Sequence, residues 1–284
     1  MTYRMLVSDL DETLLNNDGT VNPKNVAAIK AAVAQGFKFV PNTGRSFNSV
    51  QPLLETLGLK GLKDQYVISY NGGAIVENAG NKVLLTRALD PQLANQIFEA
   101  GIQVNPEIDA HIYTVNHLFI YNLSVTDRRY MNERAVPYQE IERPDADFWT
   151  SAEPIMKVIF EHPKLAVREQ IMEQVLATIG ADAVEATYSS SRYVEFNRAG
   201  VEKGSATQLL AEQLGMDMVE VMAIGDNSND LAMLKAAGLG IAVANGIEEV
   251  KKTAKVVMEH DNNHGAVAEA LEKYVLKGVD DASI

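Results

Sequence analysis

Two aspartates, Asp9 and Asp11, directly follow a short apolar run at residues 5–7. Such a run is typical of a buried strand, whose carboxyl end would present both side chains in an acidic loop. Neighbouring carboxylates repel each other unless a cation lies between them, and Mg²⁺ prefers oxygen ligands of this kind. An isolated Asp-x-Asp is more often a turn or a helix cap, so the pair gains meaning only from other parts of the chain.

A second acidic strand end follows residues 219–224, where Asp226 and Asp230 are further candidates for oxygen ligands. Between the two acidic ends, the strand predicted at residues 37–40 runs into Thr43-Gly44-Arg45. The Thr43 hydroxyl and the Gly44 backbone N–H are suited to donate to phosphoryl oxygens. Together these strand ends form a convergent set that a solvated surface has no reason to assemble, which favours a metal site over an isolated turn.

Strands and helices alternate at both ends of the chain, and this pattern must position the acidic loops. A helix from Pro23 to about Gly36 separates the first two strands, and another follows Asp230 before an apolar strand at residues 240–243. We therefore predict an α/β fold whose core is a Rossmann-like parallel sheet with helices on both faces. Ligands bind such sheets outside the carboxyl ends of the strands.

The middle of the chain follows another pattern, because strand-like runs there are separated only in part by helices. We expect an inserted α+β domain with a mainly antiparallel sheet at residues 82–197, which leaves residues 1–81 and 198–284 as a discontinuous catalytic core. The runs that predict its strands are 83–85, 111–114, 118–121, 156–160 and 193–196.

Composition and charge restrict the function further. The 284 residues carry a formal net charge of −13, and the basic residues are scattered, so we expect no nucleic-acid partner. No apolar run approaches a membrane span, and the aspartates come too early for a signal peptide, so we expect a cytoplasmic protein without a membrane partner. The absence of cysteine excludes thiolate ligands and a cysteine nucleophile. A small anionic metabolite would need local positive charge at its site.

The motifs resemble those of the haloacid dehalogenase superfamily, and within it the Cof-type sugar phosphatases with a large α/β cap. The resemblance covers nearly the whole chain. It rests on four motifs in order: Asp9-Leu10-Asp11-x-Thr13-Leu14-Leu15, Thr43-Gly44-Arg45, Lys203-Gly204 and Gly225-Asp226-Asn227-Ser228-Asn229-Asp230.

This resemblance implies a Mg²⁺-dependent phosphatase that hydrolyses small phosphomonoesters, such as sugar phosphates. Asp9 would attack phosphorus to give an aspartyl-phosphate, and Asp11 would protonate the leaving alcohol and then deprotonate the attacking water. Lys203, at the start of a helix, would place an ammonium on the phosphate and on Asp9.

The resemblance also implies roles in the fourth motif. Asp226 would ligate the metal directly, Asp230 would ligate it through water or orient Lys203, and Asn229 would donate to the phosphate. Asp9 and the backbone carbonyl of Asp11 would complete the protein's share of the metal ligands.

Three residues have open roles at this point. Arg45 either contacts a substrate phosphate or pairs with an acidic neighbour. Asn71, before two glycines, belongs to a hinge or tight turn, or lines the substrate site. Glu12 stands where many relatives have glycine, and a third carboxylate turned toward Asp11 would raise the pKa of Asp11.

Other functions compatible with the motifs are a phosphosugar mutase of the same superfamily, and a non-enzymatic phospho-acceptor or ligand-sensing protein. The strand-rich insertion favours hydrolysis over the mutase, whose cap is usually smaller and helical. A receiver-like acceptor domain would not need Asp11 or the insertion. The sequence identifies neither the physiological substrate nor the oligomeric state.

Overall fold

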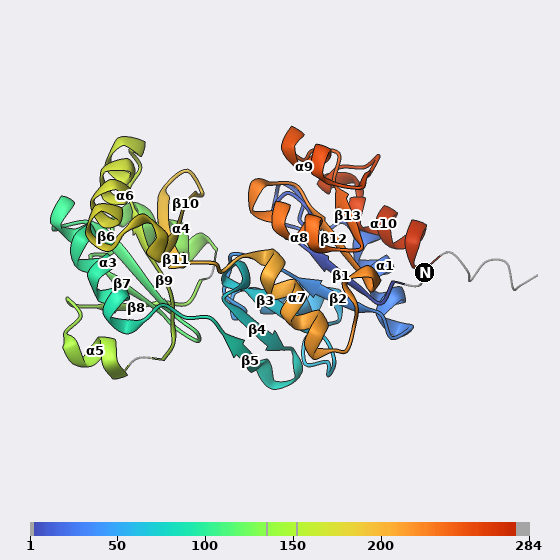
Figure 1. The fold of residues 1–284 in the computed structure, drawn as a ribbon, viewed down its shortest axis with the longest axis horizontal. Helices are drawn as coiled ribbons and strands as arrows, with labels where there is room; N and C mark the ends of the chain where they lie inside the picture. The colour runs from blue at the N-terminus through green and yellow to red at the C-terminus, as the bar shows by residue number, and fades with distance from the viewer. Residues whose placement is uncertain (1–2, 135, 152, 277–284) are drawn as a thin grey trace, which may run out of the picture. The chain divides into compact units, whose positions relative to one another are not determined.

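The computed structural model describes residues 3–134, 136–151 and 153–276 (Figure 1). The chain forms two compact units: unit 1 comprises the residues up to 85 and from 202 onward, and unit 2 comprises residues 86–201. The sequence placed the insertion at 82–197. The difference has a structural reason, because β5 (Lys82–Thr86) lies beside a strand of unit 1 and β11 (Tyr193–Arg198) extends beyond residue 197 within unit 2.

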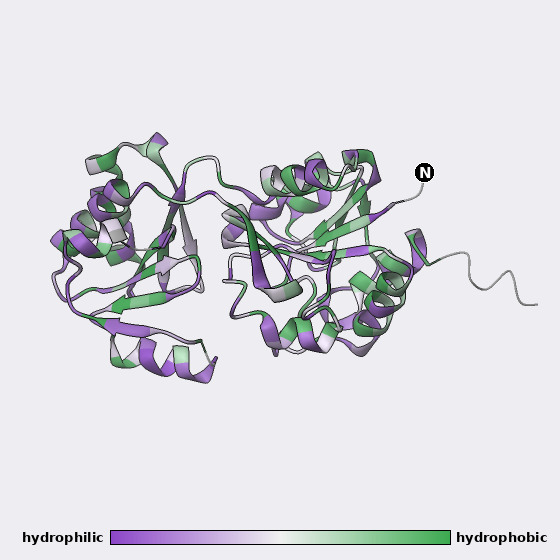
Figure 2. Cartoon of the chain, turned by 90° about the horizontal axis from the view of Figure 1, so that it is seen from below, coloured by the Kyte–Doolittle hydropathy of each residue, from purple (hydrophilic) through white to green (hydrophobic). Residues whose placement is uncertain are grey.

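Unit 1 is built on a five-stranded parallel sheet in the order β14-β13-β12-β1-β2. Apart from the edge strand β14, its strands are fully or mostly buried and largely hydrophobic (Figure 2), as expected when both faces of a sheet are covered. The strands are β1 (Met5–Ser8), β2 (Lys38–Pro41), β12 (Val221–Gly225), β13 (Leu239–Ala242) and β14 (Val256–Val257).

Helices cover both faces of this sheet. Met5 and Val7 pack in one hydrophobic cluster with side chains of α7, α8 and α9. Leu6 points to the opposite face and is also fully buried, and α1 and α10 pack against each other. The helices of unit 1 are α1 (Pro23–Ala34), α2 (Gln51–Leu57), α7 (Lys203–Gln213), α8 (Leu231–Ala236), α9 (Glu248–Thr253) and α10 (Ala266–Tyr274).

A small three-stranded sheet, β3-β4-β5, completes unit 1. β3 (Tyr66–Ser69) and β4 (Ala74–Glu77) are antiparallel and are joined by a tight turn at Tyr70–Gly72. Asn71 therefore lies in a turn inside unit 1. Gly72 is required in that turn, because its φ is +104° and a Cβ atom there would lie 2.4 Å from the carbonyl oxygen of Glu202.

Unit 2 has a six-stranded sheet in the order β10-β11-β9-β6-β7-β8. Neighbouring strands are antiparallel except β7 and β8, so the predicted mainly antiparallel sheet is confirmed. Besides β11, the strands are β6 (Asp109–Thr114), β7 (Leu118–Tyr121), β8 (Gln139–Ile141), β9 (Ile155–Glu161) and β10 (Val184–Ser189).

The two faces of the unit 2 sheet differ in chemistry. One face packs Phe160 and its neighbours against α3 (Pro91–Val104) and α6 (Leu165–Ile179) in a hydrophobic core. The opposite face contacts α4 (Val125–Glu133) through a smaller cluster and also carries buried charged side chains. A last helix, α5 (Ala146–Ser151), contributes Trp149 to the larger core. Throughout the described ranges, no helix has both the length and the apolar character needed to cross a bilayer.

Candidate active site

Asp9 and Asp226 lie side by side at the carboxyl ends of two neighbouring strands. β1 and β12 pair in parallel, with Ser8 opposite Ile224, and the Asp9 N–H donates to the Ile224 carbonyl at 3.0 Å. Both aspartates are less than 10% exposed. The parallel sheet thus brings together two carboxylates that are more than 200 residues apart in the chain.

The Lys203 ammonium joins these strand ends. Lys203 is the first residue of α7 and is 1% exposed. Its ammonium donates to Oδ1 of Asp9 and, at 2.7 Å, to Oδ1 of Asp230. The helix start is itself fixed, because Nδ2 of Asn42 and the hydroxyl of Thr207 both donate to the Lys203 carbonyl oxygen. One positive charge is therefore held between two buried carboxylates.

Asp230 has no free oxygen in this arrangement. Its Oδ2 accepts from the backbone N–H groups of Asp226, at 2.9 Å, and Asn227, at 3.0 Å. A Cβ atom at Gly225 would lie 2.5 Å from Oδ2 of Asp230, so only glycine fits before Asp226. Asp230 therefore shapes the loop and orients Lys203, which is one of the two roles considered from the sequence.

The electrostatics of the cluster follow from burial. Burial is the main cause that raises the pKa of Asp9 well above its usual value; the Lys203 ammonium opposes it, and the carboxylate of Asp230 adds to it. The pKa of Asp226 rises to about 6 for the same principal reason. Burial alone would lower the pKa of Lys203, but the carboxylates of Asp230 and Asp9 raise it above the ordinary lysine value. Lys203 therefore stays charged, while the aspartates lack full compensation.

This imbalance fits a divalent cation at the site. Carboxylate oxygens of Asp9, Asp226 and Asp230 lie within 4.8 Å of one another. Hard oxygen ligands at strand ends are a donor set that Mg²⁺ uses, and a dication would let Asp9 and Asp226 ionise together. Because both oxygens of Asp230 are already engaged, Asp9 and Asp226 are the side chains best placed to hold the ion.

Thr13 has no role in the sequence-based prediction, but the structure places it in the cluster. Its hydroxyl is fully buried and donates to Oδ1 of Asp226 at 2.7 Å, so it fixes the orientation of that carboxylate. The only sequence signal was its position within the first motif. Asn42 was likewise missed, although its amide supports the backbone of Lys203.

Thr43 and Gly44 follow β2, the other neighbour of β1. The Thr43 N–H donates to the Ile68 carbonyl at 3.0 Å, and the Asn71 N–H donates to the Thr43 carbonyl at 2.9 Å. A Cβ atom at Gly44 would lie 3.2 Å from the Asn71 amide nitrogen. The turn that contains Asn71 therefore borders the Thr43-Gly44 segment.

Asp11 lies outside the buried cluster. Its side chain is 60% exposed and forms a two-bond ion pair with Arg45, in which the Nε to Oδ2 distance is 3.1 Å. Arg45 thus pairs with an acidic neighbour, one of its two predicted roles. Asn229 also lies apart, on the exposed side of the fourth-motif loop.

Glu12 is exposed and adopts a left-handed backbone, with φ of +60°. A non-glycine residue is strained in this region, whereas glycine would adopt it without strain. The Glu12 carbonyl accepts from Nδ2 of Asn245 at 2.7 Å. The negative charge of the Glu12 side chain contributes to the raised pKa of Asp226.

Comparison with known proteins gives consistent results. The family described as haloacid dehalogenase-like hydrolase matches residues 6–271. A Serratia proteamaculans protein named HMP-PP phosphatase is 31% identical over 265 residues, which cover 88% of this chain and 86% of that protein. The Bacillus subtilis 5-amino-6-(5-phospho-D-ribitylamino)uracil phosphatase YcsE is 28% identical, with 96% of both chains covered.

Solved structures show the same architecture over both units. A haloacid dehalogenase-like hydrolase from Bacteroides thetaiotaomicron superposes with a TM-score of 0.84 at 24% identity, over 96% of this chain and 99% of that one. The resemblance read from the four motifs is thereby confirmed. The chain belongs to the haloacid dehalogenase-like hydrolases, and within that family it is a phosphatase that hydrolyses phosphoric monoesters.

Proposed function

We propose that this protein is a Mg²⁺-dependent phosphatase of small phosphorylated metabolites, sugar phosphates among them, that works through an aspartyl-phosphate on Asp9. The observation that supports this best is the Lys203 ammonium buried between Asp9 and Asp230, with Asp226 beside them. A purely structural ion pair would not need three carboxylates around one lysine at the carboxyl edge of a parallel sheet.

The contacts of Asp9 support one of its two oxygens as the attacking atom. Lys203 donates to Oδ1, which leaves Oδ2 to form the bond to phosphorus as the bond from phosphorus to the leaving oxygen breaks. The ammonium also offsets the repulsion between the carboxylate and a phosphate dianion. In the second step a water oxygen attacks phosphorus, the Asp9 oxygen leaves, and inorganic phosphate is released.

Asp11 would move the protons in both steps. It gives its proton to the leaving alcohol oxygen and then takes one from the attacking water. A protonated Asp11 cannot keep both charge-assisted bonds to Arg45, so its work as an acid requires release from that residue. The freed guanidinium would then be available for a phosphoryl oxygen, which joins the two roles considered for Arg45.

The remaining site residues would bind the phosphoryl group and the ion. The Thr43 hydroxyl, the Gly44 N–H and the Asn229 amide would donate to its oxygens, and Asn71 would border the substrate. Asp9, Asp226 and the backbone carbonyl of Asp11 would hold Mg²⁺, while Asp230 orients Lys203. When bound, the ion supplies positive charge that neutralises the reacting phosphate and aspartate.

The substrate class follows from the charge and from the relatives. A chain with a net charge of −13 repels long polyanions, whereas one phosphate on a small molecule can be held by local cations. Two relatives are named for the phosphatase reactions on HMP-PP and on a phosphoribitylaminouracil. We therefore propose small phosphomonoesters, without a choice among them.

The test is phosphate release from p-nitrophenyl phosphate and a panel of sugar phosphates, with and without Mg²⁺. We expect metal-dependent release that is lost in Asp9→Asn and kept in Asp18→Asn, a matched change at an exposed aspartate of unit 1. In Asp11→Asn, acid quenching should trap a phosphoryl group on the peptide that contains Asp9, because the second step lacks its base.

Full activity of Asp9→Asn would refute the mechanism, as would metal-independent release. An isomerised sugar phosphate with no released phosphate would identify a mutase instead. Phosphorylation of Asp9 without turnover would identify a phospho-acceptor.

A further inference from the structure

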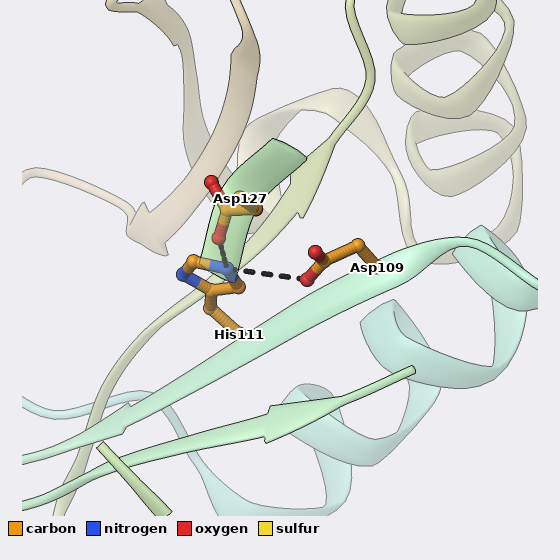
Figure 3. Close-up of side chains that lie close together, drawn as sticks. All are labelled: Asp109, His111 and Asp127. Carbon is orange, nitrogen blue, oxygen red and sulfur yellow. Dashed lines mark hydrogen bonds and ion pairs between the residues drawn. The ribbon is translucent and has the colours of Figure 1, made fainter. Parts of the chain in front are cut away.

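A histidine and two aspartates meet in the interior of unit 2 (Figure 3). His111 and Asp109 lie on the same face of β6, and Asp127 lies in the first turn of α4. Nε2 of His111 is 2.9 Å from Oδ2 of Asp127 and 3.2 Å from Oδ1 of Asp109. All three side chains are at most 3% exposed, and their ligand atoms lie within 4.8 Å of one another. Three atoms of the kind that bind metals therefore converge from two elements.

Hydrogen bonding within this cluster is incomplete. A protonated Nε2 has a single N–H, and its hydrogen bond goes to Asp127. Oδ1 of Asp109 is ion-paired with the same Nε2 at 3.2 Å, and it has no further donor among the described residues. A buried carboxylate oxygen without a donor costs about 1–3 kcal/mol or more. A metal ion in place of the Nε2 proton would satisfy both carboxylates at once.

Each carboxylate is already oriented for such an ion. The Ser124 N–H donates to Oδ2 of Asp109 at 2.8 Å, which leaves Oδ1 facing His111. The Tyr193 hydroxyl donates to Oδ1 of Asp127 at 2.5 Å, which leaves Oδ2 facing His111. Hydrogen bonds that orient the ligand side chains without contacting the metal are a regular part of protein metal sites.

Distances and charge agree with a divalent ion. Zinc ligands at about 2.0–2.1 Å in tetrahedral geometry lie about 3.3 Å from one another, close to the two separations around Nε2. Three carboxylates belong to this network, those of Asp109, Asp127 and Glu161, against the guanidinium of Arg192. With a neutral imidazole, the surplus of negative charge equals the charge of one dication.

The alternative occupant is a second proton on His111, which gives an imidazolium between the aspartates. It supplies half the charge of a dication. In both cases Nδ1 carries a proton that has no hydrogen-bond partner among the described residues, so the two occupants differ in the charge that they supply. A set of one imidazole nitrogen and two carboxylate oxygens suits Zn²⁺ better than Mg²⁺, which prefers oxygen alone.

We propose that His111 Nε2, Asp109 Oδ1 and Asp127 Oδ2 form a second metal site, for Zn²⁺ or a similar divalent transition-metal ion, which ties β6 to α4. This site belongs wholly to unit 2. It is independent of the phosphatase chemistry and of the acidic cluster in unit 1.

The experiment uses the full chain with Asp226→Asn, so that the acidic cluster of unit 1 is weakened. After treatment with EDTA and its removal, zinc is titrated by calorimetry. We expect one zinc per chain and a higher melting temperature with zinc. No stoichiometric binding of zinc would overturn the proposal.

The position of the ion is then tested in the same background by Asp109→Asn and His111→Gln. Each should weaken zinc binding at least about 100-fold, by comparison with the 10–100-fold losses seen for outer residues of metal sites. The matched control is His117→Gln, which changes an exposed histidine of unit 2 and should leave the affinity unchanged.

X-ray absorption at the zinc edge of the protein with intact His111 covers the case in which these variants fail to fold. One imidazole with light-atom ligands at about 2.0–2.1 Å supports the site. The absence of imidazole from the first shell overturns it, as does equal zinc affinity in folded His111→Gln.

Discussion

Replacement of Lys203 by methionine tests the central feature of the proposed active site. Methionine is close to lysine in length but has no charge, so Asp9 and Asp230 would lose their shared ammonium while the packing of α7 remains. Lys203 is 1% exposed, and removal of one partner from a buried ion pair costs about 3–5 kcal/mol. Protonation of Asp9, whose pKa is already raised by burial, would relieve part of this cost.

Activity should fall more clearly than stability. The loss of one preorganised donor to a developing charge typically lowers kcat by about 10²–10³. Lys203 also lowers the pKa of Asp9, so its removal raises that pKa further and less Asp9 is ionised at neutral pH. The acid limb of the rate profile should therefore move to higher pH.

The assay is p-nitrophenyl phosphate hydrolysis across pH with saturating Mg²⁺, together with urea unfolding. Lys235→Met, at an exposed lysine of α8, is the control and should match the unchanged protein in both measurements. A Lys203→Met protein with kcat within about threefold of the unchanged protein and an unshifted acid limb would refute the reasoning about this site.

Three further changes have defined outcomes. Gly225→Ala places a methyl 2.5 Å from Asp230 and should lower the unfolding free energy by about 1–3 kcal/mol in urea; an unchanged midpoint would contradict the described packing. Glu12→Gly removes a strained φ of +60° and should raise the unfolding free energy by about 1 kcal/mol. A urea midpoint that does not rise would show that Glu12 is not strained. Burial alone would lower the pKa of His111, but the carboxylates of Asp109 and Asp127 raise it to about 9. The resulting stabilisation is full below about pH 6.5 and is lost as pH rises through 9, so in EDTA the unfolding free energy should fall over this range. The fall should be absent in His111→Gln, and an identical pH dependence in both proteins would argue against the ionised histidine.

Much of the fold, and the position of the candidate site at one edge of the sheet, could be predicted because their signals are local. A strand of a parallel sheet is a short apolar run, and the residue after it must lie at the carboxyl edge. Asp9, Thr43 and Asp226 each follow such a run, so their common edge follows from the strand and helix pattern alone. The insertion was visible for the same reason, since its strands repeat without regular crossover helices.

Only the tertiary structure decided which side chains contact one another. The bonds from Thr13 to Asp226 and from Lys203 to Asp230, and the pairing of Arg45 with Asp11, join residues distant in sequence, and their direction depends on the exact position of each loop. The boundaries of the insertion differ from the predicted ones because β5 extends the small sheet of unit 1. The residues of β5 alone do not reveal this pairing.

The buried network around His111 shows the same division. β6 has the sequence of an ordinary alternating strand, in which His111 stands two residues after Asp109. No local sequence feature marks these two residues as part of a buried network. The third member, Asp127, comes from a helix that packs on the polar face of the sheet. Local sequence determined the elements and the residues at their ends, because backbone preference and hydrophobic pattern act over a few positions. The partners of buried charges were decided by the folded structure, because burial makes those charges depend on whatever groups the packing brings near them.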